Sequence, residues 1–489
     1  MSRAGYEPTE GFIADEGQVR QNFTRLMGSR RLFLGALAVL LMWLQVLGTG
    51  LAAAPPPLGE REELPNGLVF LFSEQRSVPL VAVNLLVKAG ALRDPRGKEG
   101  LAHVTALLLT QGSKKRSATQ MAQEIDFLGA KLSAGAEEDY AMVGLTVLAR
   151  DVSQGLELMA DAVLHPTFPP EELKRKVQQL LASFESDEDE PMVMARRAFD
   201  LRLYGQHPYA FPPKGTPQGL KAIQRQEVVD FHRRLYLPNN AILSVVGDIS
   251  REEARGLVMR YFGGWNPGKI PELQLPPLPP LTRPETQVID KKITQANILW
   301  GHLGITRQNP DFYAFQVMNY ILGGGGFASR LMDTIRETRG LAYSVGSTFE
   351  PGLEPGPFYI SLETKTENAA EAVDLILKEV ERLRTEPVSD AELADAKSYL
   401  IGSFPRRLDA TGKRAALMAY VEFYGLGLDY PGRYAEIIRG ITAQDVQRVA
   451  QQYLHPERYL LVVAGDASRL PKLPGLAAAG EKEKTDAKD

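Results

Sequence analysis

The sequence contains no cysteine, which excludes disulfides, thiolate metal sites and cysteine nucleophiles and leaves the redox compartment undecided. It also lacks an excess of basic residues. The formal net charge is −4, so there is no electrostatic case for nucleic-acid binding. No glycine fingerprint follows a predicted strand at the dinucleotide-binding spacing, which argues against a nucleotide-binding fold.

The overall amino-acid composition is typical of a soluble globular protein. Of the 489 residues, 44% are hydrophobic and 24% are charged, which are ordinary values for this class. A single hydrophobic core rarely grows to this length, so the chain is expected to divide into two or more domains.

An apolar run near the N-terminus, residues 32–54, bears on location. It follows two arginines and closes with an Ala-x-Ala pattern ending at Ala54, as a secretory signal peptide does. An acidic stretch precedes it, and a start at Met27 would leave an ordinary signal. We predict that residues 1–54 are a leader with a signal peptide. The alternative is an uncleaved anchor, because the run is long enough to span a bilayer. In both cases the body of the protein is expected outside the cytoplasm, in the periplasm.

A proline-rich segment, residues 266–284, divides the rest of the chain. Its sequence, NPGKIPELQLPPLPPLTRP, is incompatible with regular structure and favours an extended, semi-rigid linker. It separates a first domain, residues 55–265, from a second domain, residues 285–470, and each is close to the usual domain length. The charged tail at residues 471–489 is predicted to be disordered.

The two halves resemble each other in sequence. The first contains YLPNNAILSVVGDIS and the second YLHPERYLLVVAGDASR, so that Pro238 aligns with Pro456 and Gly247 with Gly465 at the same separation. Separate blocks at a near-constant offset indicate an internal duplication, with a period far longer than that of any solenoid repeat.

Each half mixes strands and helices. Runs rich in β-formers at residues 67–72 and 81–90 predict strands. Apolar residues at helical spacing predict one long helix in each half, with the faces Val152, Leu156, Met159 and Val163, and Val373, Ile376, Val380 and Leu383. We therefore predict an α+β fold of two homologous α/β-sandwich-like domains, each a mainly antiparallel sheet covered by helices.

Three separated segments resemble one peptidase family. They read GALRDPRGKEGLAHVTALLLTQGS, HPYAFPPKGTPQGL and LYLPNNAILSVVGD, and in this order they are similar to the pitrilysin/insulinase family of inverted-motif zinc peptidases, including processing-peptidase-like bacterial proteins. The resemblance spans residues 64–466. In active members a helix carries H-x-x-E-H, whose histidines bind zinc while the glutamate polarises water, and a later helix adds a third ligand.

This chain departs from the family where the zinc chemistry should be. His103 occupies the first histidine position, but Ala106 replaces the glutamate and Leu107 the second histidine. The third-ligand position aligns with Ser183, with Glu185 nearby. Catalytic zinc ordinarily takes three protein ligands and a water, so we predict that this chain alone has no metal and no catalytic residue.

No other group is expected to rebuild the metal site. None of the remaining histidines is four residues from another, and His232, beside two arginines, is expected on a solvated helix. The acidic run at residues 185–190 is interpreted as a solvated helical face.

The second half keeps a more complete set of residues, in NYILGGGGFASRLMDTIRETRGLAYSVGS. A flexible loop is predicted at Gly323, Gly324, Gly325 and Gly326, followed by a helix to Glu337 and a strand from Leu341. The resemblance implies that Arg336 and Tyr343 hold the substrate backbone or the developing oxyanion, as hydrogen-bond donors can. The alternative is that Arg336 pairs with a nearby carboxylate and Tyr343 fills the sheet face.

The resemblance also implies a division of labour. In several members one chain keeps zinc and another keeps the arginine–tyrosine pair, so we interpret this chain as the non-catalytic subunit of a heterodimeric peptidase, with zinc in its partner and a peptide as substrate. The family adds its substrate as a strand at a sheet edge, which maps to residues 131–145. The alternatives are a purely structural subunit of a larger assembly, or an active peptidase with substituted ligands.

Overall fold

The computed structural model describes residues 57–475. The predicted leader at residues 1–54, with its signal peptide or anchor, lies outside this part of the chain, as does most of the tail. Between residues 57 and 475, no helix is both long and apolar enough to cross a membrane.

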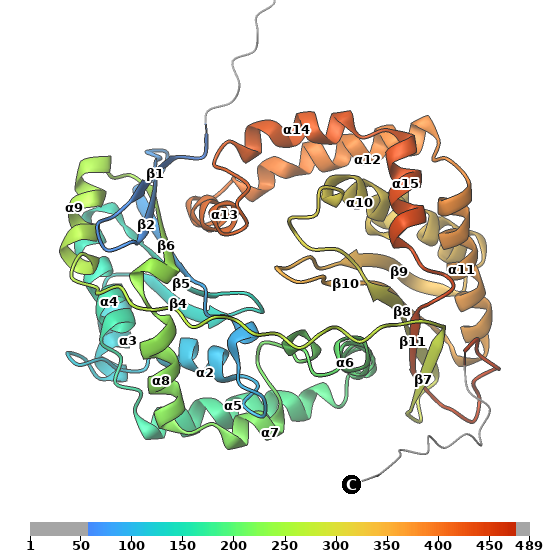
Figure 1. The fold of residues 1–489 in the computed structure, drawn as a ribbon, viewed down its shortest axis with the longest axis horizontal. Helices are drawn as coiled ribbons and strands as arrows, with labels where there is room; N and C mark the ends of the chain where they lie inside the picture. The colour runs from blue at the N-terminus through green and yellow to red at the C-terminus, as the bar shows by residue number, and fades with distance from the viewer. Residues whose placement is uncertain (1–56, 476–489) are drawn as a thin grey trace, which may run out of the picture. The chain divides into compact units, whose positions relative to one another are not determined.

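The first half is built on a six-stranded sheet in the order β1-β2-β6-β3-β5-β4 (Figure 1). Its neighbouring strands are antiparallel except β2 and β6, which are parallel. Every residue of β6 is buried, as expected for an apolar strand covered on both faces. The strands are β1 (Glu60–Glu63), β2 (Val69–Glu74), β3 (Leu80–Val87), β4 (Lys131–Ala136), β5 (Ala141–Leu148) and β6 (Ala241–Gly247).

The second half repeats this topology. Its sheet has the order β7-β11-β8-β10-β9, with β7 and β11 parallel and the other pairs antiparallel. This is the order of the first sheet without β1, and the aligned Gly247 and Gly465 each end the equivalent strand. The prediction of two homologous α+β domains is confirmed. The strands are β7 (Glu285–Asp290), β8 (Gln295–Leu303), β9 (Ala342–Phe349), β10 (Pro357–Lys365) and β11 (Leu460–Gly465).

Helices cover one face of each sheet, and the predicted apolar faces are buried in α4 and α11. In the first half, α2, α4 and α9 contact the sheet. The helices of this half are α2 (Leu101–Leu108), α3 (Ala118–Phe127), α4 (Val152–Leu164), α5 (Pro170–Asp187), α6 (Pro191–Tyr204), α7 (Pro217–Ala222), α8 (Arg225–Leu235) and α9 (Arg251–Phe262).

In the second half, α10 and α11 contact the sheet, and α15 packs on both of them. The helices are α10 (Phe312–Asn319), α11 (Ala369–Thr385), α12 (Asp390–Ser403), α13 (Thr411–Phe423), α14 (Tyr430–Gly440) and α15 (Ala443–Tyr453). Three short turns follow α10: η5 (Tyr320–Gly324) and η7 (Met332–Thr338) are π-helical, and η6 (Gly326–Ala328) is 3₁₀.

Two helices cross from one half to the other. The helix α6 precedes the linker but packs on β8 and β11, where Phe199 is fully buried in a cluster with Leu299 and Val462. The helix α13 belongs to the second half but packs on β3 and β6, and the buried Ser244 hydroxyl donates to the carbonyl oxygen of Ala415 at 2.8 Å. Each sheet is therefore covered on its second face by a helix from the other half.

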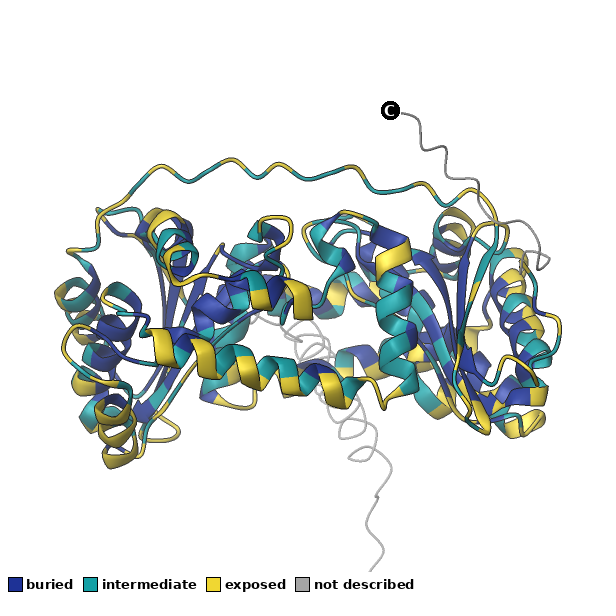
Figure 2. Ribbon diagram, turned by 90° about the horizontal axis from the view of Figure 1, so that it is seen from below, coloured by how far each residue is buried: buried dark blue, intermediate teal, exposed yellow. Residues whose placement is uncertain are grey.

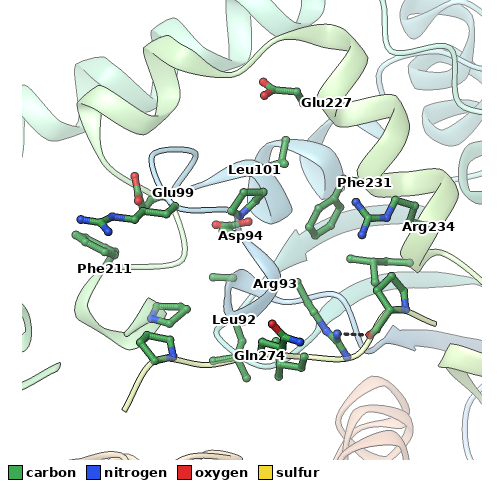
Figure 3. A pocket seen from close by; sticks show the side chains of 18 of the residues that line it. Leu92, Arg93, Asp94, Glu99, Leu101, Phe211, Glu227, Phe231, Arg234 and Gln274 are labelled. Atoms are coloured by element: carbon green, nitrogen blue, oxygen red, sulfur yellow. Dashed lines mark hydrogen bonds between the residues drawn. The ribbon is translucent and has the colours of Figure 1, made fainter. Parts of the chain in front are cut away.

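The proline-rich segment, residues 266–284, forms neither helix nor strand and runs as an extended strap (Figure 2). Arg93 donates from Nη1 to the carbonyl oxygen of Pro271 at 2.8 Å, which ties the strap to the first half. A cavity of about 760 Å³ opens between the strap, α8 and the start of α2 (Figure 3). Its walls carry charges of both signs, including Arg234 and Glu227, and none of the residues predicted for the functional site.

Candidate functional site

The helix α2 carries the three positions of the degenerate zinc motif. Gly100 precedes it with a φ of +103°, a left-handed conformation that glycine adopts without strain. Asp94 accepts hydrogen bonds from the backbone N–H groups of Gly100 and Ala102, both at 2.7 Å. Burial raises the pKa of Asp94 to about 7, although these hydrogen bonds oppose the shift. The start of the motif helix is therefore firmly held.

The motif side chains pack as ordinary helix residues. Ala106 is fully buried and Leu107 is half-buried. His103 has its Nδ1 3.1 Å from the carbonyl oxygen of Ala136 at the end of β4, which fixes the ring. Burial lowers the pKa of His103; the hydrogen bond with Ala136 and the charge of Glu137 oppose this shift, and the positive charge of Lys214 adds to it.

The third-ligand position is occupied by Ser183 on α5. Its hydroxyl donates to the carbonyl oxygen of Leu180 at 2.7 Å and accepts a hydrogen bond from Nζ of Lys214 at 3.3 Å. The same Nζ lies 2.5 Å from Oδ2 of Asp187, one turn further along α5. Glu185, the other carboxylate near this position, is exposed.

One sequence-based prediction in this half is wrong, the one for His232. The acidic run at residues 185–190 is exposed as predicted except for Asp187, which is half-buried and pairs with two cations, one of them Lys214. His232 is not on a solvated surface, because it is half-buried, its Nε2 lies 2.8 Å from the carbonyl oxygen of Val163, and its ring stacks on Tyr236 with the centroids 4.8 Å apart. Burial lowers the pKa of His232 to about 4.

The groups around the degenerate motif do not fit a zinc ion. They offer a single imidazole beside a methyl, an isobutyl and a hydroxyl group, whereas catalytic zinc takes three protein ligands. A lysine ammonium group also lies at the third-ligand position. Within residues 57–475, no three His, Cys, Asp or Glu side chains come together as a metal site.

Arg336 and Tyr343 are brought together by the structure. Arg336 lies on η7, and Tyr343 is the second residue of the edge strand β9. The guanidinium carbon of Arg336 is 5.1 Å from the centroid of the Tyr343 ring and 4.6 Å from that of Phe327. Tyr343 is 85% exposed and Phe327 73% exposed, so the cation is held between two solvent-facing rings.

The guanidinium group of Arg336 keeps donors available. In the part of the chain that the structure describes, the one carboxylate within 4 Å is that of Glu337, whose Oε1 lies 3.5 Å from Nε. Of the alternative, the pairing of Arg336 with a nearby carboxylate is present in the contact with Glu337, whereas Tyr343 is 85% exposed and does not fill a buried sheet face. Both side chains instead present polar groups to the solvent beside the edge of the second sheet.

The four-glycine run is more ordered than the flexible loop that the sequence predicts. Gly323 and Gly324 continue α10 as the π-helical turn η5. A Cβ atom on Gly323 would lie 2.4 Å from the backbone nitrogen of Ser347 on β9, so glycine is needed for the turn to approach that strand. Gly326, with a φ of +58°, then leads directly into Phe327. The run docks α10 on β9 and positions one of the two rings that hold the arginine.

The edge strands of the two sheets are equivalent. β4 and β9 each occupy the outermost position after β5 and β10, respectively. The segment at residues 131–145 contains β4, so an edge lies where the sequence places one. Its use by a peptide remains a prediction.

A second group of polar residues was not indicated by the sequence. A cavity of about 680 Å³ is lined by the turns of the β4–β5 and β9–β10 hairpins. Asp139, in the first turn, accepts hydrogen bonds from the hydroxyl of Tyr424 at 2.8 Å and from the backbone N–H of Leu353 at 2.9 Å. Arg196 pairs with Glu350 at 2.7 Å. These partners are far apart in sequence, and no local motif marks them.

Two family models match consecutive parts of the chain. The model described as insulinase (peptidase family M16) matches residues 69–208, and the model described as peptidase M16 inactive domain matches residues 222–400. The second model begins within the first half, before α8, and ends in α12 of the second half, whereas the positions of the zinc motif lie within the first match.

Known proteins similar to this chain cover most of its length. The crystal structure of a peptidase M16 inactive domain from Pseudomonas fluorescens is 30% identical, with a TM-score of 0.79, and covers 85% of this chain and 99% of that one. A protease from Helicobacter pylori, 21% identical with a TM-score of 0.77, covers 84% and 100% and has the same fold.

Curated proteins similar to this chain include several that are named zinc protease. A protein named uncharacterized zinc protease from Rickettsia bellii is 28% identical over 404 residues, which are 80% of this chain and 93% of that protein. Uncharacterized zinc protease YmxG from Bacillus subtilis is 25% identical, over 83% of this chain and 98% of its own length.

Proposed function

Because the chain belongs to the insulinase family of peptidases, peptidase family M16, we propose that it is the zinc-free subunit of a heterodimeric peptidase. Its role is to supply Arg336, Tyr343 and the glycine turn to a homologous partner that carries zinc. The observation that carries the proposal is the state of Arg336, which lies beside two exposed rings and has one carboxylate neighbour among the described residues, Glu337 at 3.5 Å from Nε. The degenerate motif supports the same division, because its residues do not fit a metal.

The chemistry of peptide hydrolysis gives these groups a task. Negative charge develops on the carbonyl oxygen as the peptide bond is attacked, and fixed hydrogen-bond donors lower the energy of that state. The guanidinium group of Arg336 and the hydroxyl of Tyr343 are such donors. Zinc in the partner would supply the activated water. The rings of Phe327 and Tyr343 limit the motion of the guanidinium group, so little reorganisation is needed when the charge appears.

The proposed setting is outside the cytoplasm. The signal-peptide pattern within residues 1–54 supports export to the periplasm, with membrane anchoring as the alternative form of the same location. The substrate class is a peptide, in line with the family, and it would lie along an exposed strand edge such as β4 or β9.

The decisive test is reconstitution. The purified chain, a homologue from the same genome with an intact H-x-x-E-H motif, and an equimolar mixture of the two are assayed with a mixed set of fluorogenic peptides. We expect this chain alone to be inert and free of tightly bound zinc, and the mixture to cleave faster than the homologue alone. A complex in which no zinc-bearing homologue takes part would instead support a purely structural role.

One result would overturn the proposal outright. It is the isolation of this chain by itself with one tightly bound zinc per molecule and peptidase activity. Zinc is measured by elemental analysis of protein purified from its own cell, because adventitious loading during overproduction is then avoided.

A further inference from the structure

The degenerate zinc site contains a cation of its own, the ammonium group of Lys214. The backbone of Lys214 packs directly on the start of α2. A Cβ atom on Gly100 would lie 2.9 Å from the carbonyl oxygen of Lys214 and 3.0 Å from Cα of Gly215. The next residue, Thr216, donates from its backbone N–H to the carbonyl oxygen of Glu99 at 3.3 Å. The root of the Lys214 side chain is therefore fixed at the N-terminus of the motif helix.

The head of the same side chain reaches α5. Nζ of Lys214 lies 3.3 Å from Oγ of Ser183 and 2.5 Å from Oδ2 of Asp187, and it sits 4.5 Å from the centroid of the Phe184 ring. Arg197, from the middle of α6, pairs with the same Asp187 carboxylate and lies 4.5 Å from the same ring. Two acceptors and an aromatic face thus surround the ammonium group.

These contacts include one of the positions at which active relatives bind their metal, that of the third ligand. By the family resemblance, zinc joins the helix of the first histidine to the helix of the third ligand, which here are α2 and α5. His103 lies one turn after Gly100 on α2, and Ser183 occupies the third-ligand position on α5. The Lys214 backbone lies against the start of α2, and its ammonium group contacts α5.

We propose that the Lys214 ammonium group replaces the metal ion in this chain, as a resident cation that tethers α2 to α5 and excludes a divalent ion from the site. The tether is supplied by the chain itself and needs no ligand. A fixed positive charge beside Ser183 also raises the energy of a divalent ion placed at the same position. This explains how the first half keeps the packing of the motif helix although its metal ligands are gone.

An ordinary surface ion pair would not act as a tether between helices. Exposed pairs contribute little measurable stability and do not hold two helices together. Lys115, which pairs with Glu157 at 3.2 Å, is such a pair in the same half and provides the matched control.

The first experiment compares Lys214→Met with Lys115→Met in the full chain by hydrogen–deuterium exchange. Methionine keeps an unbranched side chain of similar length and removes the charge. We expect Lys214→Met to raise exchange rates in α2 and α5 at least about fivefold and Lys115→Met to leave them unchanged. Lys214→Arg, which keeps the charge, should restore most of the protection. Equal behaviour of Lys214→Met and Lys115→Met would overturn the tether.

The second experiment restores the metal ligands. A variant with Ala106→Glu, Leu107→His and Ser183→Glu is titrated with zinc by calorimetry, with Lys214 present and with Lys214→Met added. We expect zinc to bind at least about tenfold more tightly when the lysine is absent, because a divalent ion then meets no fixed cation. Equal affinities in two variants that both keep native circular dichroism would overturn the exclusion. If the restored variants do not fold, the exchange comparison still decides the proposal.

Discussion

The two halves of this chain share a strand order but differ in the side chains that lie beside the edge strands β4 and β9. In the first half, the helix beside β4 has Ala106 and Leu107 where active relatives have a glutamate and a histidine, and Lys214 lies beside it. In the second half, the edge strand β9 carries Tyr343 next to Arg336, whose Nε lies 3.5 Å from the carboxylate of Glu337. The helix α2 therefore lacks the residues that bind zinc in active relatives, but the sheet on which it packs is intact. The comparison shows that the fold does not depend on the catalytic groups.

What holds the halves is apolar packing that is independent of those groups. The helix α6 closes the second face of one sheet and α13 that of the other. The α6 contact is dominated by buried side chains such as Phe199 and Leu203, while the α13 contact includes the buried hydrogen bond from Ser244. Substitutions in this packing should change stability, and substitutions at Arg336 should change activity alone.

The largest effect is expected for Phe199→Ala. The ring is fully buried between α6 and the second sheet, so its removal loses transfer free energy and leaves a cavity. The free energy of unfolding should fall by about 3–5 kcal/mol, as measured by urea denaturation. Leu201→Ala, on the exposed side of the same helix, should cost less than about 1 kcal/mol. Equal losses in the two variants would mean that α6 does not hold the sheet through Phe199.

The next effect concerns activity in the reconstituted peptidase. Arg336→Ala should lower kcat by about 10²–10³-fold, because it removes donors aimed at the charge that develops in the transition state. Arg339→Ala is the matched control, since Arg339 lies one turn further on and pairs with Glu371 at the surface. Both variants should unfold at the same urea concentration as the parent chain.

The outcome for Arg336 also tests whether the two halves differ in catalytic role. If Arg336→Ala and Arg339→Ala leave the rate of the mixture equally unchanged, the second half has no role in catalysis. The two halves would then be alike in having lost their chemistry, and the chain would be a structural subunit.

The sequence predicts the sheets and the helix faces because these are local patterns. Val152, Leu156 and Val373 repeat at helical spacing, and all three are buried. The crossing of α6 to the other half is not predictable in this way. Its apolar positions, such as Phe199, reveal a face to be buried but not which sheet will cover it.

The site shows the same limit. His103 and Ala106 are identified through the family resemblance, whereas the contact of Lys214 with Asp187 joins a loop to a helix 27 residues away in sequence and is not indicated by the segment that contains Lys214. The wrong prediction for His232 had a usable signal: it lies four residues after the buried Val228, so helical spacing places it toward the core despite the arginines that follow it.

A smaller effect links His232 to pH. Its pKa is about 4 in the folded chain, below the ordinary value of 6.5, because burial disfavours the charged ring. A lowered histidine pKa gives stability that is present above pH 6.5 and lost as the pH falls toward 4. The free energy of unfolding of the parent chain should fall between pH 7 and pH 4 as His232 is protonated. In His232→Phe, which keeps an aromatic ring, this fall should be smaller by up to about 3 kcal/mol. The exposed His165→Gln is the control and should leave the slope unaltered. A slope that is the same in both variants would contradict the buried, neutral ring.

The smallest effect isolates the aromatic clamp around Arg336. Phe327→Ala removes one of the two rings but none of the hydrogen-bond donors, and an exposed cation–π contact contributes about 0.5–1 kcal/mol. The rate of the reconstituted peptidase should therefore fall only about two- to fivefold, through looser positioning of the guanidinium group. Phe127→Ala, an equally solvent-facing phenylalanine in the first half, should leave the rate unchanged. A loss at Phe327 as large as that of Arg336→Ala would show that the ring contacts the substrate itself, so that the second half would contribute a binding surface as well as a charge.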